Sequence, residues 1–335
     1  MNMTSESELI EKVKRIIEKR GRASVEKARE EILDSPYDGG IVSSAVKYFA
    51  RVTLRQGLPV FPALISLSCE AVGGNTEKTI TIGAAMELIA GAADVHDDII
   101  DQSAIKYNKK TVLGKFGSDV ALLAGDALLM QGLMLLSRES DSLSEEQRKA
   151  IQNVILQALF EISNAEANEI RLRKKLDTSP QEYYEVIRLK AVIPEAHCKI
   201  GGILGNANEQ TINALGQYGR TFGVLSLIRD EFIDLLEHDE LQNRLKNECP
   251  PLPMLYALQN SKTRRKIEPL IKGLNLAKKD ENKLVKIVLD SIEVKNLKNK
   301  MISMAQKAVG RAPFKSDVPV GTEASLLMWI VTEGI

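Results

Sequence analysis

Apolar residues recur at helical spacing along almost the whole chain. From Leu9 to Ile17 they fall about every three to four positions, which places them on one face of a helix. Gly21 is expected to interrupt this first helix, and the same spacing resumes from Val25 to Ile32. No segment alternates apolar and polar residues as a half-buried strand does. The pattern therefore predicts an all-α fold, a large helical bundle.

Turn and capping residues set the ends of the expected helices. The prolines of Gly57–Pro62 should break the chain, and Gly73 and Gly74 should end the helix that follows. Ser144 and Ser179 each begin a capping box, the second with proline at the first helical position. We expect loops at 34–40 and 104–117 and helices at about 41–56, 62–72, 76–101, 118–130, 144–175, 179–201 and 209–237, with amphipathic helix beyond 260.

The composition favours one domain of an intracellular protein. The 335 residues are 44% hydrophobic, and no shift in composition divides them. We therefore expect a single domain over 1–335, with N-terminal helices in 1–35, a core in 36–315 and a C-terminal tail in 316–335. The three cysteines are far apart and form neither a disulfide framework nor a metal motif, which suits a reducing cytosol.

Charge and hydropathy exclude further classes. Lys plus Arg and Asp plus Glu balance at 45 each, and no basic stripe with aromatic residues indicates nucleic-acid binding. The acidic, polar N-terminus is unlike a signal peptide, and no apolar run reaches the roughly 18–20 residues of a membrane span. A cytoplasmic location is the prediction.

An apolar, alanine-rich segment from Glu87 ends in three carboxylates: Asp97, Asp98 and Asp101. Residues four apart share a helix face, so Asp97 and Asp101 project together, with Asp98 about 100° away. Close carboxylates repel one another, and a hard cation such as Mg²⁺ relieves that repulsion. The alternative is an acidic helix end that is simply solvated.

A second cluster repeats this spacing with Asp230, Glu231 and Asp234. Two such clusters in one bundle make sense if they face each other and share cations that a phosphorylated ligand bridges. Mg²⁺ on a diphosphate would stabilise the charge of the leaving group, and apolar helices would enclose a hydrocarbon chain. The alternative is a surface helix end in which Arg229 pairs with the carboxylates.

Four segments together resemble the all-trans isoprenyl (polyprenyl) diphosphate synthase family, whose members have the class I isoprenoid synthase fold, a large helical bundle around a central hydrophobic cavity. The resemblance covers roughly residues 40–260. The segments are His96–Asp101, Val112–Asp126, Tyr218–Gly223 leading into Arg229–Asp234, and Leu252–Leu258.

The resemblance implies a Mg²⁺-dependent prenyltransferase that binds and ionises an allylic diphosphate. It makes Asp97, Asp101 and Asp230 metal ligands, with Asp98, Glu231 and Asp234 in support. It also places two cations on the allylic diphosphate, Lys106 and Lys190.

The sequence departs from the family at the second diphosphate site. Family members bind isopentenyl diphosphate through basic residues, whereas this chain has Leu58, Phe61, Ala90 and Tyr107 at those four positions. A charged hydrogen bond is worth about 1.5–3 kcal/mol, so these losses should weaken binding severely. A lysine usual after the second motif is also missing, because its position holds Glu248 or Cys249.

These departures predict an acceptor other than isopentenyl diphosphate, with Tyr107 as a hydrogen-bond donor to it. Two alternatives stay open: a conventional synthase with a remodelled second site, and a non-catalytic subunit of a heteromeric synthase.

The residues before the first motif bear on chain length. Family members that make short chains carry bulky aromatic residues where this chain has Ala92 and Ala93, so the expected substrate is an allylic prenyl diphosphate of C20 or longer. The resemblance also implies a homodimer that packs through the apolar helix around Val120–Met130. A lipid product implies peripheral membrane contact.

Overall fold

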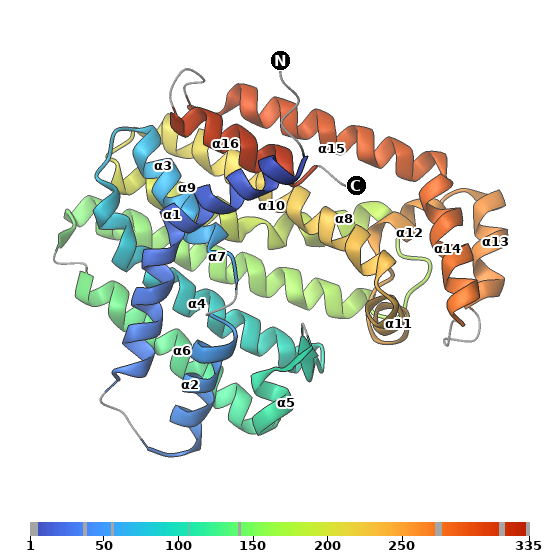
Figure 1. Cartoon of the computed structure of the whole chain (residues 1–335), viewed down its shortest axis with the longest axis horizontal. Helices are drawn as coiled ribbons and strands as arrows, with labels where there is room; N and C mark the ends of the chain where they lie inside the picture. The colour runs from blue at the N-terminus through green and yellow to red at the C-terminus, as the bar shows by residue number, and fades with distance from the viewer. Residues whose placement is uncertain are drawn as a thin grey trace. The chain divides into compact units, whose positions relative to one another are not determined.

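The chain folds into helices joined by short connections, which confirms the all-α prediction (Figure 1). The structure is a computed structural model, and it describes residues 6–35, 39–54, 57–106, 108–139, 142–271, 277–314 and 319–332. Among these residues the only sheet is a two-residue antiparallel hairpin, in which Ile105 pairs with Lys110 and Lys106 with Lys109.

The chain forms two compact units, and each draws on separate stretches of sequence. Unit 1 comprises Met1–Asn153, His197–Ile212 and Lys315–Glu323, and unit 2 comprises the remaining residues. Four helices run from one unit into the other: α7 (Glu145–Leu172), α9 (Val192–Leu204), α10 (Glu209–Leu236) and α16 (Pro319–Ile330). The single domain over 1–335 stays a prediction.

Unit 1 contains the N-terminal helices and the hairpin. Its elements are α1 (Glu6–Leu33), α2 (Ile41–Val52), α3 (Val60–Ala71), η1 (Thr76–Lys78), α4 (Thr79–Ile100), β1 (Ile105–Lys106), β2 (Lys109–Lys110), α5 (Val112–Phe116) and α6 (Ser118–Glu139).

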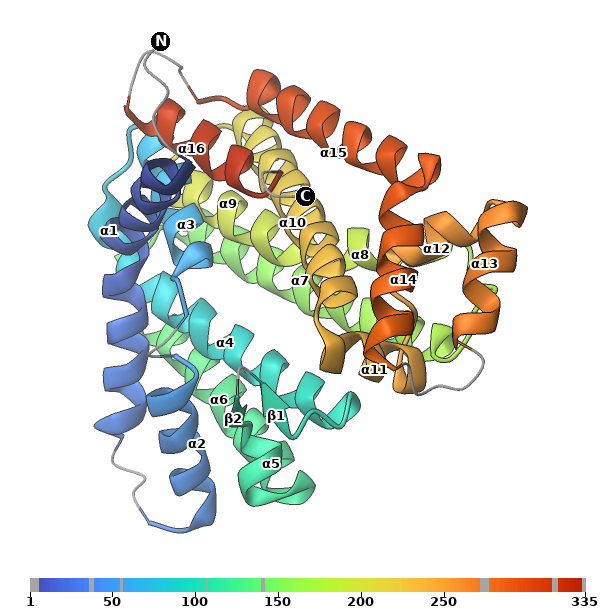
Figure 2. The same ribbon diagram turned by 45° about the vertical axis from the view of Figure 1, so that its right-hand side comes forward.

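Helix α4 is the centre of unit 1. It packs most extensively on α6 and also on α1 and α3, and Figure 2 shows it running toward the β1–β2 hairpin with α5 and α6 beside it. Small residues allow these close approaches. A Cβ on Gly132 of α6 would lie 2.7 Å from Ile89 Cγ1, and one on Gly83 would lie 2.5 Å from Ser24 Oγ of α1. The alanine- and glycine-rich composition of α4 therefore positions the carboxylates at its end.

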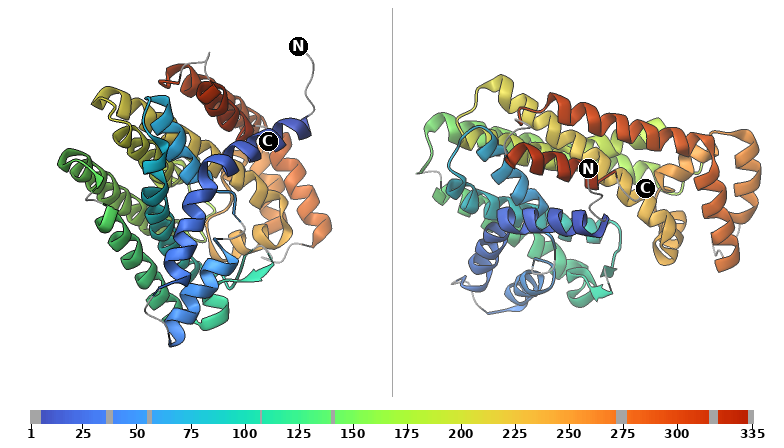
Figure 3. Two further views of the ribbon diagram at one scale, coloured as in Figure 1. Left: turned by 60° about the vertical axis from the view of Figure 1, so that its left-hand side comes forward. Right: turned by 45° about the horizontal axis from the view of Figure 1, so that its top comes forward.

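Unit 2 contains the C-terminal helices. Its elements are α8 (Pro180–Lys190), α11 (His238–Asn247), α12 (Leu252–Leu258), α13 (Ser261–Ile271), α14 (Lys278–Asp290) and α15 (Ile292–Arg311). Helix α12 contacts α8, α13, α14 and α15, and Figure 3 shows α13 and α14 as neighbours at the end of α15. The α8 N-terminus has the predicted capping box, with Ser179 as N-cap and Pro180 in the first turn.

Three expected boundaries were wrong. Gly21 does not interrupt α1. Its missing side chain instead allows the start of α3 to approach closely, because a Cβ there would be 2.3 Å from Pro59 O. The predicted loop 104–117 contains the hairpin and α5, which Thr111 caps through the Gly114 N–H. The helix expected from Ser179 to Gly201 is broken at Ala191, because Pro194 has no N–H for the carbonyl of residue 190.

The predicted C-terminal tail is mostly helical. Helix α16 buries Val320, Leu327 and Met328, and it carries Glu323, which accepts a 2.6 Å hydrogen bond from Arg20 of α1. The segment is therefore part of the folded structure.

One helix among the described residues, α6, is long and apolar enough to cross a membrane by length and composition alone. Its apolar window has a mean hydropathy of 1.7, with 39% of the window buried. The sequence analysis expected no such run. A single helix of this kind is weak evidence for a span, and α6 contacts α2, α4 and α5.

The crossing of α1 and α3 predicts opposite effects for two glycine substitutions. Gly21→Ala should lower the free energy of unfolding by about 2 kcal/mol or more, because the new methyl group meets the Pro59 backbone. Gly310→Ala in α15 has nothing within 4 Å of the new Cβ and should raise the free energy of unfolding by about 0.5–1 kcal/mol. Urea denaturation of both variants tests this, and equal effects would contradict the close crossing.

Candidate active site in two acidic clusters

The first acidic cluster lies at the C-terminal end of α4. The Asp101 N–H donates to Asp97 O (2.8 Å), so the last helical turn continues through the motif and keeps these two residues one turn apart. The Asp98 side chain is almost completely buried, at 3% exposure. Asp97 Oδ1 is buried and accepts no hydrogen bond within the described part of the chain. An unsatisfied carboxylate oxygen of this kind is costly unless a cation joins it.

Lys106 is the cation nearest this cluster. Strand β1 carries it back toward α4, where its Nζ lies 2.8 Å from Asp98 Oδ1, 3.9 Å from Asp97 Oδ2 and 3.2 Å from Asp94 Oδ1. The sequence analysis placed Lys106 on the diphosphate of the substrate. In the structure it pairs with the carboxylates, and the β1–β2 hairpin holds it there.

Burial and charge act in opposite directions at this cluster. Burial raises the pKa of Asp98 to about 6, which Lys106 partly offsets and the neighbouring Asp94 and Asp97 increase. Burial works against the charged form of Lys106, but the carboxylates, Asp94 first, raise its pKa above the ordinary value. Lys106 is therefore charged whenever the carboxylates are.

The second cluster lies near the end of α10 and is dominated by an arginine. Arg244 of α11 is buried and binds Glu231 through two nitrogens, Nη1 and Nη2, each 3.0 Å from one carboxylate oxygen. Its Nη1 also donates to Asp234 Oδ2 at 2.8 Å. The Tyr183 hydroxyl of α8 accepts from Arg244 Nη2 (2.6 Å) and lies 2.8 Å from Glu231 Oε1.

Asp230 differs from its two neighbours. Part of its side chain is exposed, whereas Glu231 is buried. Its pKa is raised to about 6 by desolvation, an effect that the nearby Arg229 partly offsets. Burial likewise raises the pKa of Asp234 to about 7, against the effect of Arg244.

Lys190, the second cation expected on the diphosphate, ends α8. It pairs with Glu166 at 3.0 Å and with Glu169, both on α7. Glu169 is well satisfied, because Lys190 and Arg244 lower its pKa against the opposing effect of burial. Its role toward a substrate stays a prediction.

The segment expected to hold the second diphosphate contains no cation of its own among the described residues. Leu58 is 44% exposed, and the Phe61 ring packs on His197 with centroids 5.3 Å apart. Ala90 is partly buried on α4, and Tyr107 lies outside the described residues.

An arginine from another helix approaches this segment. Arg22 of α1 donates to Gly57 O at 3.2 Å, next to Leu58, and pairs with Glu18 at 2.6 Å. Glu87, one turn before Ala90 on α4, is a further acidic neighbour of Arg22, after Glu18 and Glu26. Burial raises the pKa of Glu87, and Arg22 partly offsets that increase. Sequence reasoning missed Arg22, since nothing in its spacing connects it with residues 57–61.

The two alanines before the first motif have different surroundings. Ala92 is 2% exposed, whereas Ala93 is only partly buried. The position that a chain could reach from the Asp97 face is therefore Ala93. The substrate length expected from these alanines stays a prediction.

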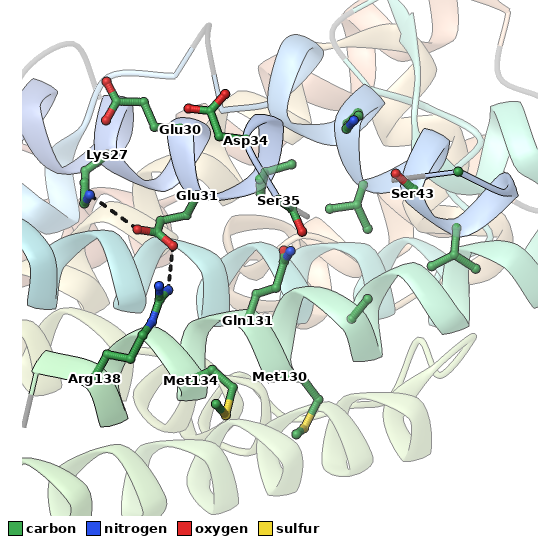
Figure 4. A pocket seen from close by; sticks show the side chains of 16 residues that line it. Lys27, Glu30, Glu31, Asp34, Ser35, Ser43, Met130, Gln131, Met134 and Arg138 are labelled. Carbon is green, nitrogen blue, oxygen red and sulfur yellow. Dashed lines mark hydrogen bonds and ion pairs between the residues drawn. The ribbon is translucent and has the colours of Figure 1, made fainter. Parts of the chain in front are cut away.

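A groove of about 900 Å³ lies between α1, α2 and α6, away from both motifs. Figure 4 shows Glu31 at its edge between Lys27 and Arg138, and Gln131 pointing into it. None of the predicted site residues lines it.

The donor set of the first cluster suits Mg²⁺. Asp97 and Asp101 are oxygen donors one turn apart, and Asp97 Oδ1 has no protein partner. No group of three or more His, Cys, Asp or Glu in the described ranges is arranged to hold a metal without help. That arrangement fits an ion that takes one or two carboxylates and completes its shell with water and substrate phosphate. At the second cluster Glu231 and Asp234 already bind Arg244.

Comparison with known proteins decides the family. A sequence model of polyprenyl synthetases matches residues 43–289, about three quarters of the chain. The chain belongs to the polyprenyl synthetase family. Its first acidic cluster, its second cluster and the segment at Leu58 all lie inside the matched region.

Relatives and solved structures agree with this assignment. A short chain isoprenyl diphosphate synthase of Methanothermobacter thermautotrophicus is 34% identical over 185 residues, which cover 55% of this chain and 56% of the relative. A geranylgeranyl diphosphate synthase of Sulfolobus acidocaldarius is 28% identical over 225 residues, 67% of this chain and 65% of the relative. These matches span between about half and two thirds of the relatives.

The crystal structure of a geranylgeranyl pyrophosphate synthetase from Pyrococcus horikoshii Ot3 has the same fold. It superposes with a TM-score of 0.85 at 24% identity, over 97% of this chain and 99% of that one. The class I isoprenoid synthase fold expected from the sequence is confirmed.

The partly buried Glu87 predicts a pH-dependent stability. Its folded-state pKa of about 7 lies above the ordinary 4.5, so the native state holds a proton that the unfolded state releases. Stability from this group is present below about pH 4.5 and is lost as pH rises through 7. Glu87→Gln should therefore raise the free energy of unfolding by about 1–2 kcal/mol at about pH 8 and change it little at about pH 4.5.

Urea denaturation at both pH values tests this, with Glu77→Gln, exposed on η1, as the matched control. An identical effect of Glu87→Gln at the two pH values would contradict the raised pKa.

Proposed function

We propose that the protein is a Mg²⁺-dependent isoprenyl diphosphate synthase whose site for the second substrate is remodelled. The observation that carries the proposal is the first acidic cluster of a polyprenyl synthetase, with Asp97 Oδ1 buried and unpartnered and Lys106 beside it. Both curated relatives named above are isoprenyl diphosphate synthases by name.

The chain's own residues would act as follows. Asp97 and Asp101 hold the metal-bound allylic diphosphate at the end of α4, and Asp98 and Lys106 balance the charge there. Asp230 contributes from the second cluster. Mg²⁺, when bound, neutralises the negative charge that grows on the diphosphate as the carbon–oxygen bond breaks. Lys106 is held close enough to exchange its carboxylate partners for the diphosphate.

Arg22 is the residue we assign to the second diphosphate. It reaches Gly57 O, in the segment where family members carry their basic residues, and its guanidinium suits an oxyanion. Glu18 would have to release it, because that carboxylate binds it in the structure. Support comes from this proximity and from the family of the chain.

A second candidate is transfer of the prenyl cation to an uncharged acceptor. It is favoured by the apolar Leu58 and Phe61 and by Ala90, which replace basic ligands of isopentenyl diphosphate. A non-catalytic role in a heteromeric synthase is the third, and it would leave the isolated protein inert.

The substrate length proposed here is C20 or longer. Support comes from Ala93, a small, partly buried residue one turn before Asp97, at a position where short-chain members have an aromatic residue. Contact with a membrane through the lipid product and a cytoplasmic location remain predictions from the sequence.

A homodimer is proposed through the outer face of α6. Five large apolar side chains there are between 36% and 57% exposed: Leu122, Leu123, Met130, Leu133 and Met134. A contiguous apolar face of this kind is typical of a protein–protein contact.

The central test measures diphosphate release from C10 to C25 allylic diphosphates with Mg²⁺, with and without isopentenyl diphosphate. We expect release and chain elongation only when isopentenyl diphosphate is present, and a loss of about 100-fold or more in Asp97→Asn. Release in its absence would favour the uncharged acceptor instead. No turnover under either condition would favour the non-catalytic subunit.

The remodelled site makes its own prediction. Arg22→Gln should raise the KM for isopentenyl diphosphate about 10-fold or more and leave the KM for the allylic diphosphate nearly unchanged, because a charged hydrogen bond is lost only at the second site. Arg15→Gln, exposed on the same helix, is the matched control. Equal changes in both KM values would remove Arg22 from this role.

A further inference from the structure

Compared with the family pattern, the second acidic cluster lacks a lysine but has an arginine, Arg244, beside it. The lysine usual after the second motif is replaced by Glu248 or Cys249. In the structure the side chain of Arg244, on α11, contacts both of these residues. Its Nε donates to Cys249 O at 2.9 Å and lies 3.3 Å from Glu248 Oε2. A positive charge is therefore present beside the second motif, on a different residue.

The guanidinium N–H groups of Arg244 all donate hydrogen bonds to protein atoms. Nη1 bonds Glu231 and Asp234, and Nη2 bonds Glu231 and the Tyr183 hydroxyl. The two oxygens of Glu231 accept from the two terminal nitrogens of the guanidinium, which is a bidentate, end-on arginine–carboxylate pair. Arg244 is 5% exposed and Glu231 6% exposed, so water competes little with these bonds.

Glu231 has no acceptor position to spare. Besides Arg244, its Oε2 accepts from the Leu252 N–H at 2.8 Å, and its Oε1 lies 2.8 Å from the Tyr183 hydroxyl. A carboxylate offers about four lone-pair positions. All are directed at protein groups from α8, α11 and the start of α12, and a metal ion would have to displace several of them together.

We infer that Arg244 is a positioning residue that permanently occupies the second acidic cluster. It holds Glu231 and Asp234 as structural anions and leaves Asp230, the exposed member, as the carboxylate that meets a metal-bound diphosphate. The inference rests on the proposed function for the identity of that ligand. It keeps Asp230 as the metal ligand that the resemblance implied, and it gives the supporting role of Glu231 and Asp234 a physical basis, because both carboxylates bind the arginine.

Metal binding gives the first test. Bound Mn²⁺ is measured by electron paramagnetic resonance in the presence of inorganic pyrophosphate, with no turnover required. Asp230→Asn should weaken Mn²⁺ binding about 10-fold or more, whereas Glu231→Gln should change it less than about 2-fold, because Asp230 is the metal ligand within the second cluster and Glu231 is not. Glu231→Gln that weakens Mn²⁺ as strongly as Asp230→Asn would overturn the inference.

A double-mutant cycle gives the second test and needs no metal. Glu231→Gln and Arg244→Gln should each lower the melting temperature by several degrees, because each leaves a buried charge without its partner. The double variant should fall by clearly less than the two losses added together, since the pair is then absent. Strictly additive losses would show that the pair is not a unit. Glu240→Gln, a partly exposed neighbour on α11, is the control.

The two measurements separate this inference from the proposed function. Wild-type protein that binds no Mn²⁺–pyrophosphate would overturn the proposed function, and the cycle would still decide whether Arg244 holds Glu231. Should Arg244→Gln fail to fold, Arg244→Lys replaces it: a single ammonium cannot reproduce the bidentate pair with both Glu231 oxygens, so a lowered melting temperature is expected again. An unchanged melting temperature would contradict the inference.

Discussion

Buried carboxylates need a nearby positive charge, and in the described parts of this chain both acidic clusters have a basic side chain beside them. In the first cluster a lysine on a two-residue strand supplies part of the charge, and Asp97 Oδ1 stays unsatisfied. In the second cluster a buried arginine supplies nearly all of it. Desolvation makes each unpaired charge expensive, so the two solutions have different consequences. The first cluster is ready for an external cation, and the second is mostly occupied.

The packing of the helices sets the positions of the carboxylates and of their basic partners. Helix α4 can deliver its carboxylates because glycine and alanine let α1, α3 and α6 approach its backbone closely. Helices α8 and α11 converge on Glu231 through Tyr183 and Arg244. Close packing and polar satisfaction therefore depend on each other: a small residue on one face of a helix fixes where the acidic end of that helix lies.

The family assignment and the second substrate rest on different kinds of observation. The matched region and the shared fold identify a polyprenyl synthetase. The residues at Leu58, Phe61 and Ala90 set the chain apart from members that bind a second diphosphate with basic side chains. Arg22 of α1 lies beside Gly57 O, so a charge deleted from the motif can return from a distant helix. Arg244 does the same at the second cluster.

Sequence alone determined the helical class, the family and the two acidic clusters, because helical periodicity and the spacing of carboxylates are local properties of the chain. It also predicted the capping boxes at Ser144 and Ser179, where the partners are three residues apart. Only the tertiary structure decided which cations meet those carboxylates. The hairpin brings Lys106 to its partners, and the packing of helices brings Arg22 and Arg244 to theirs. The need for a glycine at position 21 within α1 likewise comes from the close approach of Pro59. Such contacts join residues up to 61 positions apart, as between Arg244 and Tyr183, and no local pattern encodes them.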